Sequence, residues 1–401
     1  VLVAGSAAAS GESEEGKTVL VSRWAGPHAD DLKDVVADFP KAEVVVDDID
    51  YGSLRQKQLT SFQAAQGTGN YDAVWVASQW MKEYVDAGYI MALDDLIAEN
   101  NFDTSIYAAG MMDGVEFDGK IYGLPTFAQC LILAYDSEAF EEAGIEVPTT
   151  SEELVEVARY FKENEGTGIA IPARQGSAAV TLYSQLLFSN GGYYFDEDGN
   201  LDLTSDASIA AATTYDQLAE YSVQGSLAWH HDETAEAVRT KRAPIGTVMS
   251  GLANQFADPE RSMVVDTVRY APIAGRDGHA AANNSFWVWA IPENTNDVDL
   301  AFDFVTWVTS PAVEKEMTLM NQQISGITSL ANDPEVLEMA PFLPVVMEQL
   351  ANGKMDPALR NFQTLREALI VGLSEIASTD ADPREVMQKV QDELKDVDFS
   401  S

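Results

Sequence analysis

The first third of the chain alternates between strand-like and helix-like segments, and this alternation restricts the fold more than any other feature. The runs "TVLVSRW", "AEVVVDDI" and "YDAVWVA" are apolar and rich in β-branched residues, which predicts strands. The segments between them have helical spacing, as in Leu32, Val35, Val36 and Phe39 at i, i+3, i+4 and i+7. Strands separated by helices are typical of βαβ units, so the sequence predicts a parallel sheet with right-handed crossovers.

The rest of the chain carries further strand and helix signals in a less regular order. Runs that predict strands are "CLILAYD", "GIAIPA", "APIGTVM", "MVVDTVRYAPI" and "SFWVWAI". Thr150 and Glu153 in "PTTSEELVEVARYF" have capping-box spacing and predict the start of a helix. The "DG" of "YYFDEDGNLDL" predicts a hairpin turn, and from Asn296 onward the pattern is mostly helical. The sequence therefore predicts an α/β protein of two lobes with a helical C-terminal region.

Charge limits the partners of this chain. Of its 401 residues, 65 are acidic and 24 are basic, so the formal net charge is −41. Such a surface repels nucleic acid and anionic lipid, which makes both poor partners. The acids are spread along the chain rather than gathered in a tail. We interpret them as a solvated surface suited to a saline medium, in preference to a site for cationic ligands.

Three features bear on the compartment. The opening "VLVAGSAAAS" resembles the end of a secretory signal, with small residues in an A-x-A arrangement at Ala7–Ala9. We therefore expect residues 1–16 to be a signal remnant and flexible leader, and the protein to be periplasmic or otherwise extracytoplasmic. No apolar stretch approaches the ~20 residues that span a bilayer. The single cysteine, Cys130, lies in an apolar run, which predicts a buried thiol and no intramolecular disulfide.

The stretch "GESEEGKT" at 11–18 matches the G-x-x-x-x-G-K-T pattern of a phosphate-binding loop. Such a loop follows a strand and opens a helix, so that backbone N–H groups face the phosphates. Here a segment of small residues precedes the match, and the strand-like "TVLVSRW" follows it. Glu12, Glu14 and Glu15 would also place three carboxylates beside the phosphates. We interpret the match as an acidic leader and not as a nucleotide site.

Motifs for catalysis and metal binding are weak. The chain contains neither G-x-S-x-G nor H-E-x-x-H. In "WHHDE", His230 and His231 are adjacent, so on a strand they would point to opposite faces and not share one ion. In "DEDGNLD", Gly199 stands at the fourth position instead of the sixth, so the calcium-loop pattern fails. We expect no catalytic residue, no metal and no cofactor, although 65 acids leave a catalytic carboxylate pair open.

Aromatic and polar residues follow the carboxyl ends of several predicted strands or open the late strand "SFWVWAI". Ligands bind at this edge in open α/β sheets. Flat rings stack on C–H faces, and neutral amides both donate to and accept from hydroxyls, so the set suits an uncharged, polyhydroxylated solute. The candidate ligand-binding residues are Trp24, His28, Ser78, Gln79, Trp80, Phe127, Gln129, Arg174, Trp229, Met249, Ser250, Asn284, Phe286 and Trp287.

These candidates divide by chemistry. Each aromatic residue taken alone is more often part of a core, but five of them are expected to be stacking platforms: Trp24, Trp80, Phe127, Trp229 and Trp287. Basic residues are few near the candidate loops, and the main exceptions are Arg23 and Arg174. We therefore expect neutral solutes to bind in preference to sugar acids or phosphates.

The stretch "GKIYGLPTFAQCLILAYDSEAFEEAGIEVPTTSEEL" resembles the signature of extracellular solute-binding proteins of family 1, which include the maltose-binding proteins of ABC importers. The shared pattern is a G-K-x-Y-G-[LIV]-P turn, an apolar strand, Y-[ND], and a helix ending in E-x-A-G. "SNGGYYFDEDGNLDL", "AFDFVTWVTSPAVEKEM" and "YDAVWVASQWMKEYVDAGYIMAL" resemble further segments of the family. The resemblance covers nearly the whole chain from about Thr18, although "TTSEEL" lacks the Trp of the family's T-W-x-E-L.

The resemblance implies a periplasmic-binding-protein-like fold, with two α/β lobes, a hinge and a ligand cleft between the lobes. It implies an N-terminal lobe of residues 17–124 and 284–332, and a C-terminal lobe of residues 125–283 and 333–401. Two positions that carry sugar-contacting acids in maltose-type members are occupied here by Gln79 and Gln129. Together with the bulk of "NNSFW", these exchanges favour a monosaccharide, polyol or small glycoside over a maltodextrin.

The resemblance also implies a monomer that captures a small neutral sugar or polyol by lobe closure and delivers it to the transmembrane permease subunits of an ABC importer. This role needs no chemistry on the solute, so we do not expect an enzyme. Two alternatives stay open, a secreted carbohydrate-active enzyme and a sugar-sensing receptor component. Product formation from a glycan panel would distinguish the enzyme from a binding protein. Neighbouring genes for permease domains would favour transport over the sensing role.

Overall fold

The computed structural model describes residues 16–25, 29–65, 70–321, 324–357, 359 and 361–399. The expected leader, apart from Gly16, lies outside these residues, as does the candidate residue His28. The chain divides into two compact units. Unit 1 comprises Val1–Asp103, Val115–Thr126 and Trp287–Gln323, and unit 2 comprises Thr104–Gly114, Phe127–Phe286 and Ile324–Ser401. The lobe boundaries expected from the resemblance differ from these, chiefly at 104–114 and 324–332, and stay a prediction.

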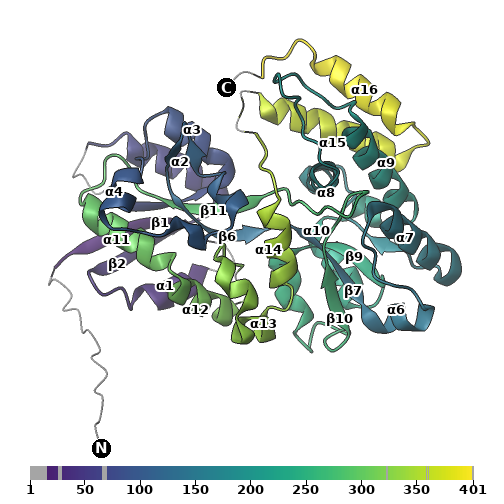
Figure 1. The fold of residues 1–401 in the computed structure, drawn as a ribbon, viewed down its shortest axis with the longest axis horizontal. Helices are drawn as coiled ribbons and strands as arrows, with labels where there is room; N and C mark the ends of the chain where they lie inside the picture. Colours follow the sequence, from purple (N-terminus) through teal and green to yellow (C-terminus); the bar gives the residue numbers. More distant parts are fainter. Residues whose placement is uncertain are drawn as a thin grey trace, which may run out of the picture. The chain divides into compact units, whose positions relative to one another are not determined.

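Unit 1 is built on a five-stranded sheet (Figure 1). Its order is β2-β1-β3-β11-β6, with the bounds Glu43–Ile49, Thr18–Trp24, Ala73–Ala77, Ser285–Ala290 and Leu124–Gln129. β1 pairs in parallel with β2 and with β3, as the alternation of strands and helices predicted. β11 pairs antiparallel with β3. All five residues of β3 are buried, which explains why its sequence is a continuous apolar run.

The helical periodicity of the first third is also present in the structure. Leu32, Val35 and Val36 of α1 and the following Phe39 are all buried. The Phe39 ring meets Phe304 of α11 edge-on, with the ring centroids 5.6 Å apart. The helices of this unit are α1 (Ala29–Val36), α2 (Tyr51–Phe62), α3 (Met81–Asp86), α4 (Asp94–Glu99), α11 (Val298–Val308) and α12 (Pro311–Asn321), and a short ribbon is formed by β4 (Glu116–Phe117) and β5 (Lys120–Ile121).

Unit 2 contains a four-stranded sheet of order β10-β7-β9-β8, with the bounds Val268–Ala271, Leu131–Asp136, Ile245–Met249 and Ile169–Ala170. β7 is antiparallel to both of its neighbours, whereas β8 and β9 are parallel. The helices are α5 (Ala109–Met112), α6 (Ser137–Ala143), α7 (Ser151–Glu165), α8 (Ser177–Ser189), α9 (Asp206–Glu220), α10 (His231–Arg239), α13 (Pro334–Met339), α14 (Leu343–Ala351), α15 (Phe362–Ser378) and α16 (Pro383–Leu394). Within the described ranges, no helix is long and apolar enough to cross a bilayer.

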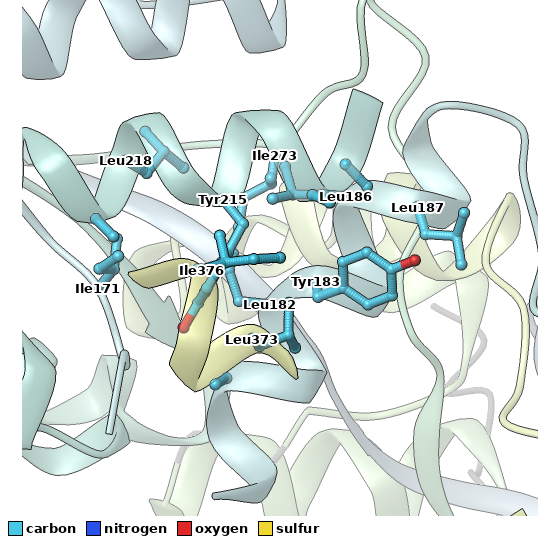
Figure 2. Close-up of a cluster of buried hydrophobic side chains, with 14 of the residues drawn as sticks. Ile171, Leu182, Tyr183, Leu186, Leu187, Tyr215, Leu218, Ile273, Leu373 and Ile376 are labelled. Atoms are coloured by element: carbon cyan, nitrogen blue, oxygen red, sulfur yellow. The ribbon is translucent and has the colours of Figure 1, made fainter. Parts of the chain in front are cut away.

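The core of unit 2 is centred on α8. Eleven of its side chains are buried, from Ala178 through Val180 and from Leu182 to Ser189, so this helix is buried on all sides. Figure 2 shows how its side chains pack against residues of α9 and α15. One residue after β8 and one after β10 join the same cluster. The labelled residues are Leu182, Tyr183, Leu186 and Leu187 of α8, Tyr215 and Leu218 of α9, Leu373 and Ile376 of α15, and Ile171 and Ile273.

Two local predictions are modified by the structure. Thr150 accepts a hydrogen bond from the Glu153 N–H at 3.2 Å, but the Glu153 carboxylate accepts from Thr149 instead of closing the reciprocal box on Thr150. The "DG" hairpin is reduced to a turn with one bridge between Phe195 and Leu201. The Asp196 carboxylate closes that turn by accepting from the backbone of residues 198 and 200, at 3.0 and 2.8 Å. "DEDGNLD" is therefore a turn held by its own carboxylate.

An acidic cluster formed by α9 and the segment before α16 makes unit 2 sensitive to pH. Burial, followed by the charges of Glu220, Asp380 and Asp382, raises the pKa of Asp216 to about 6. The Asp216 carboxyl therefore binds a proton more tightly in the folded state than in the unfolded chain. Protonation of Asp216 stabilises the fold fully below about pH 4, and this stabilisation is lost as the pH rises through 6. We expect Asp216→Asn to raise the melting temperature at pH 7 and to leave it unchanged at pH 4.

The matched control is Asp198→Asn, because Asp198 is exposed at the tip of a turn. Melting curves of both variants and of the wild type at pH 4, 5, 6 and 7 test the prediction. If the gain from Asp216→Asn were the same at every pH, proton binding at this carboxyl would not be its cause.

Candidate functional site

The parallel strands of unit 1 end at one edge of its sheet, and β11 begins there. Trp24, the last residue of β1, pairs with Ile49, the last residue of β2. Trp287 of β11 pairs with Ala77, the last residue of β3. The residues that follow these strand ends are Tyr51 at the start of α2 and, in the 3-10 turn after β3, Ser78, Gln79 and Trp80. This is the edge at which open α/β sheets bind ligands.

Four rings gather at this edge and are called the aromatic cluster below: Trp24, Tyr51, Trp80 and Trp287. Trp24 and Trp287 are nearly parallel, at 10°, with their centroids 5.5 Å apart. Tyr51 stands at 72° to Trp24 and at 76° to Trp287, with centroid distances of 5.9 and 6.1 Å. Trp80 meets Trp287 edge-on at 6.1 Å. Trp287 is 5% exposed and Tyr51 is 46% exposed, so Trp287 forms the base of the cluster and Tyr51 its solvent side.

The base of the cluster rests on a further ring. Trp75 of β3 stacks on Trp287 with a centroid distance of 4.3 Å. The guanidinium of Arg23 lies over Trp75, 4.7 Å from the ring centroid, and Arg23 is 3% exposed. A buried cation over an indole adds a cation–π attraction to this packing. Arg23, which the sequence placed near the candidate loops, therefore lies in the interior of unit 1, where its charge helps to support the cluster.

The polar partner of the cluster is Gln79. This side chain is exposed, and its Nε2 donates to the Tyr51 hydroxyl at 3.0 Å. The neighbouring Ser78 is buried, so its side chain is less accessible to a solute than that of Gln79. Tyr51 was not among the residues expected from the sequence. The rule that selected Trp24 and Gln79, position directly after a parallel strand, would also have selected Tyr51.

Unit 2 has a comparable edge. β9 ends at Met249, which pairs with Leu131, the first residue of β7, so Gln129 and Ser250 lie at the same edge. Ser250 is 1% exposed and holds the main chain of Cys130: its hydroxyl accepts from the Cys130 N–H at 3.1 Å and its own N–H donates to the Cys130 carbonyl at 2.9 Å. The predicted burial of Cys130 is confirmed, and this burial raises the pKa of its thiol to about 12. Ser250 thus supports the edge, whereas Met249 and Gln129 are half-buried.

Gln129 is placed by the glycine that follows Ser250. A Cβ on Gly251 would lie 2.9 Å from Gln129 Oε1 and 4.0 Å from the Phe127 ring. Such a short contact means that the amide lies directly over the glycine backbone. Phe127 is 3% exposed, so it offers little area for stacking.

We expect Gly251→Ala to displace the Gln129 amide while leaving the fold intact. The displaced atom is the end of a flexible side chain, so the free energy of unfolding should change by less than ~1 kcal/mol. Solute binding should weaken about tenfold, because the amide loses hydrogen bonds worth ~1–3 kcal/mol. Calorimetric titration of Gly251→Ala and Gln129→Ala, singly and combined, tests this. If the losses of binding free energy in Gly251→Ala and Gln129→Ala simply added in the double variant, Gly251 would not act through the Gln129 amide.

Arg174 and Trp229 are joined through the main chain, since the Arg174 N–H donates to the Trp229 carbonyl at 3.1 Å. Trp229 is 8% exposed and is covered by the Arg242 guanidinium, 4.9 Å from its ring centroid. Arg174 is exposed. The backbone N–H of His230 lowers the pKa of Glu233, and the Arg174 charge lowers it further, so Arg174 has an anionic neighbour. This exposed arginine therefore has a carboxylate in its surroundings.

The two adjacent histidines lie close together at the start of α10. Their ring centroids are 4.5 Å apart, and burial, followed by the charge of His230, lowers the pKa of His231 to about 3, so His231 is neutral at pH 7. In the described part of the chain, no group of three or more His, Cys, Asp or Glu side chains could hold a metal ion. His230 instead caps α10, with its N–H donating to the Glu233 carboxylate at 2.8 Å.

Two further candidates are buried in the packing of unit 2, and their role in ligand binding stays a prediction. Asn284 is 3% exposed, and its Nδ2 donates to the Gly110 carbonyl at 3.2 Å. Phe286 is 1% exposed, and a Cβ on Gly114 would lie 2.7 Å from its ring. Both side chains expose little surface in this structure, so they are less accessible to a solute than Gln79.

Comparison with known proteins decides the family. The family model described as bacterial extracellular solute-binding protein matches residues 25–315. The chain is a bacterial extracellular solute-binding protein. The family expected from the sequence resemblance is therefore confirmed, and so is the two-lobe α/β fold class, although the exact lobe boundaries are not.

Relatives and solved structures of this solute-binding protein span most of its length. A probable amino-acid ABC transporter periplasmic-binding protein of Sinorhizobium fredii is 25% identical over 86% of this chain and 80% of the relative. A mannitol-binding protein of Pseudomonas aeruginosa is 27% identical over 80% of this chain and 74% of the relative. The crystal structure of an ABC transporter solute-binding protein of Agrobacterium radiobacter in complex with ribitol shares the fold, with a TM-score of 0.77, 24% identity, and coverage of 96% of this chain and 100% of that one.

Proposed function

We propose that this solute-binding protein captures a small neutral carbohydrate or polyol outside the cytoplasm and delivers it to the permease of an ABC importer. The observation that carries the proposal is the aromatic cluster with Gln79 beside it at the edge of the unit 1 sheet. Exposed rings stack on C–H faces, and an amide donates to and accepts from hydroxyls. A polyhydroxylated solute without charge presents both kinds of group.

The charges near the candidate residues support a neutral solute. Arg23 lies in the interior over Trp75, and the exposed Arg174 has Glu233 as a neighbour. The mannitol-binding relative and the fold neighbour that holds ribitol agree with a polyol in particular. The surplus of acidic residues works against anionic solutes in the same direction, since it repels them at long range.

The proposal includes a monomer that binds without chemistry on the solute. Members of the family are binding proteins, and the relatives named above are binding components of transporters. A carbohydrate-active enzyme would release product from the solute. We expect the recovered solute to be unchanged after prolonged incubation with the protein, as measured by chromatography.

A second candidate is an amino acid. The relative from Sinorhizobium fredii carries such a name, and Arg174 beside Glu233 places opposite charges where a zwitterion could meet both. An amino acid would depend on Arg174 and not on the aromatic cluster. Arg174→Ala should therefore abolish binding of an amino acid and leave binding of a neutral polyol nearly unchanged.

A thermal-shift screen tests the proposed function. The panel contains D-mannitol, ribitol, lactose, D-glucose, D-gluconate and the common amino acids. A ligand that binds only the folded state raises its stability by RT ln(1 + [L]/Kd), about 2.7 kcal/mol at a hundred times Kd. We expect shifts with one or more neutral sugars or polyols and none with gluconate. Shifts with amino acids alone would replace the proposal by the second candidate.

A further inference from the structure

Tyr51 is not among the candidate residues expected from the sequence, and the comparisons do not assign it to the solute. It is separated from β2 by Asp50 and opens α2, where the Asp50 carboxylate caps the helix by accepting from the Ser53 N–H at 3.1 Å. Its ring stands across the edges of Trp24 and Trp287 and is tilted by 31° to Trp80. The cap and the three neighbouring rings therefore fix the place of an aromatic side chain that is 46% exposed.

We propose that Tyr51 positions the Gln79 amide for the solute, and the inference rests on the proposed function. The Tyr51 hydroxyl accepts a hydrogen bond from Gln79 Nε2 at 3.0 Å. An amide has a donor end and an acceptor end, so binding the donor end to Tyr51 turns Oε1 outward. Gln79 then presents an acceptor to the solute, and the solute must offer an O–H or N–H at that point.

The exposure of Gln79 explains why such positioning matters. An exposed glutamine samples many rotamers in solution, and ordering them on binding weakens the affinity. A tyrosine has two torsions and is held here by three indole rings, so it is ordered before the solute arrives. The hydrogen bond from Gln79 to Tyr51 restricts the rotamers of Gln79 before the solute binds. Gln79 is therefore preorganised as a binding residue.

The inference also assigns a direction to specificity. With Oε1 outward, Gln79 favours solutes whose hydroxyl points toward it and disfavours analogues in which that hydroxyl is removed or methylated. A solute with only acceptor atoms at this position would leave the Gln79 oxygen facing another oxygen. The chemical class that fits is therefore a hydroxyl donor, as in a polyol or an unsubstituted sugar ring.

The test uses Tyr51→Phe, which keeps the ring and removes only the exposed hydroxyl. The control is Tyr89→Phe, because Tyr89 is a half-buried tyrosine of the same unit that stacks on Phe62 outside the aromatic cluster. In the ligand-free protein, the side-chain amide resonances of Gln79 are followed by ¹H–¹⁵N spectra and identified by their loss in Gln79→Ala. We expect Tyr51→Phe to shift them and Tyr89→Phe to leave them in place.

Binding of D-mannitol and ribitol is then measured by calorimetry in a double-mutant cycle. We expect Tyr51→Phe to weaken binding about three- to tenfold, the weight of one hydrogen bond, and to have no further effect when Gln79 is already alanine. Unshifted Gln79 resonances in Tyr51→Phe, or losses that simply add, would overturn the inference. Failure of every solute of the thermal-shift panel to bind the wild type would overturn the proposed function instead, while the amide resonances would still decide whether Tyr51 holds Gln79.

Discussion

Trp287→Ala is expected to lower the free energy of unfolding by about 3–5 kcal/mol, the range for truncating a buried aromatic side chain. Trp287 is 5% exposed and contacts four rings, so its removal leaves a cavity beneath the aromatic cluster. The same cavity removes the support of Trp24 and Tyr51. Binding of a neutral solute should therefore be lost together with stability.

Urea unfolding followed by circular dichroism measures the first effect. The comparison variant is Trp80→Ala, which removes a half-buried ring of the same cluster and should cost clearly less. Trp287→Phe keeps an aromatic base and should retain part of the binding, which separates loss of the site from loss of the fold. An unfolding midpoint of Trp287→Ala equal to that of the wild type would show that Trp287 is not the base of the cluster.

Gln349→Leu is expected to lower the free energy of unfolding by roughly 2–6 kcal/mol, because two buried donors, the Ile273 N–H and one hydrogen of Gln185 Nε2, lose their acceptor at ~1–3 kcal/mol each. Gln349 is fully buried on α14, and its Oε1 accepts from the Ile273 N–H and from Gln185 Nε2, both at 2.9 Å. Its Nε2 donates to the Leu131 carbonyl at 3.0 Å. A leucine of similar size fills the space but offers none of these bonds.

The network around Gln349 extends the edge of the unit 2 sheet. The pairing of β10 with β7 ends at Ala271 and Leu133. Two residues earlier, the Leu131 N–H donates to Gln185 Oε1 at 3.0 Å, so side-chain amides continue the hydrogen bonding where the strand stops. This fixes the chain next to Gln129, and Gln349→Leu should weaken solute binding as well.

The matched control is Gln217→Leu, since Gln217 is exposed on α9 and should tolerate the change within about 0.5 kcal/mol. Chemical denaturation of both variants provides the comparison. Equal stabilities of Gln349→Leu and Gln217→Leu would contradict the role assigned to the buried amides.

Much of the fold could be predicted from the sequence because its signals are local. β1 and β3 are largely buried in the sheet, so they appear as apolar β-branched runs, and α1 has one buried face, so its apolar residues recur with helical spacing. The antiparallel insertion of β11 beside β3 could not be predicted in this way. It joins segments more than 200 residues apart, and nothing in the apolar run "SFWVWAI" specifies its neighbour.

The candidate site could be predicted as a location more easily than as a set of side chains. The carboxyl ends of the strands led to Trp24, Gln79 and Trp80, which the structure brings together with Trp287. Phe286 and Trp287 of "NNSFW" were both expected to contact the solute. They are successive residues of a strand, so their side chains point to opposite faces and have different surroundings. Phe286 and Trp287 are buried, unlike the exposed candidates. Burial depends on packing partners that are distant in sequence, so the sequence could not predict this difference.

Calorimetric titration of D-mannitol and ribitol into the wild type and Trp24→Ala tests the central claim most directly. Trp24 is half-buried, so its truncation should leave the fold intact while removing a stacking surface of the aromatic cluster. The account predicts saturable binding to the wild type, weakened about thirtyfold or more by Trp24→Ala, as for an aromatic anchor worth at least ~2 kcal/mol. Binding of these polyols with equal affinity to both proteins would contradict a site at this edge of the sheet.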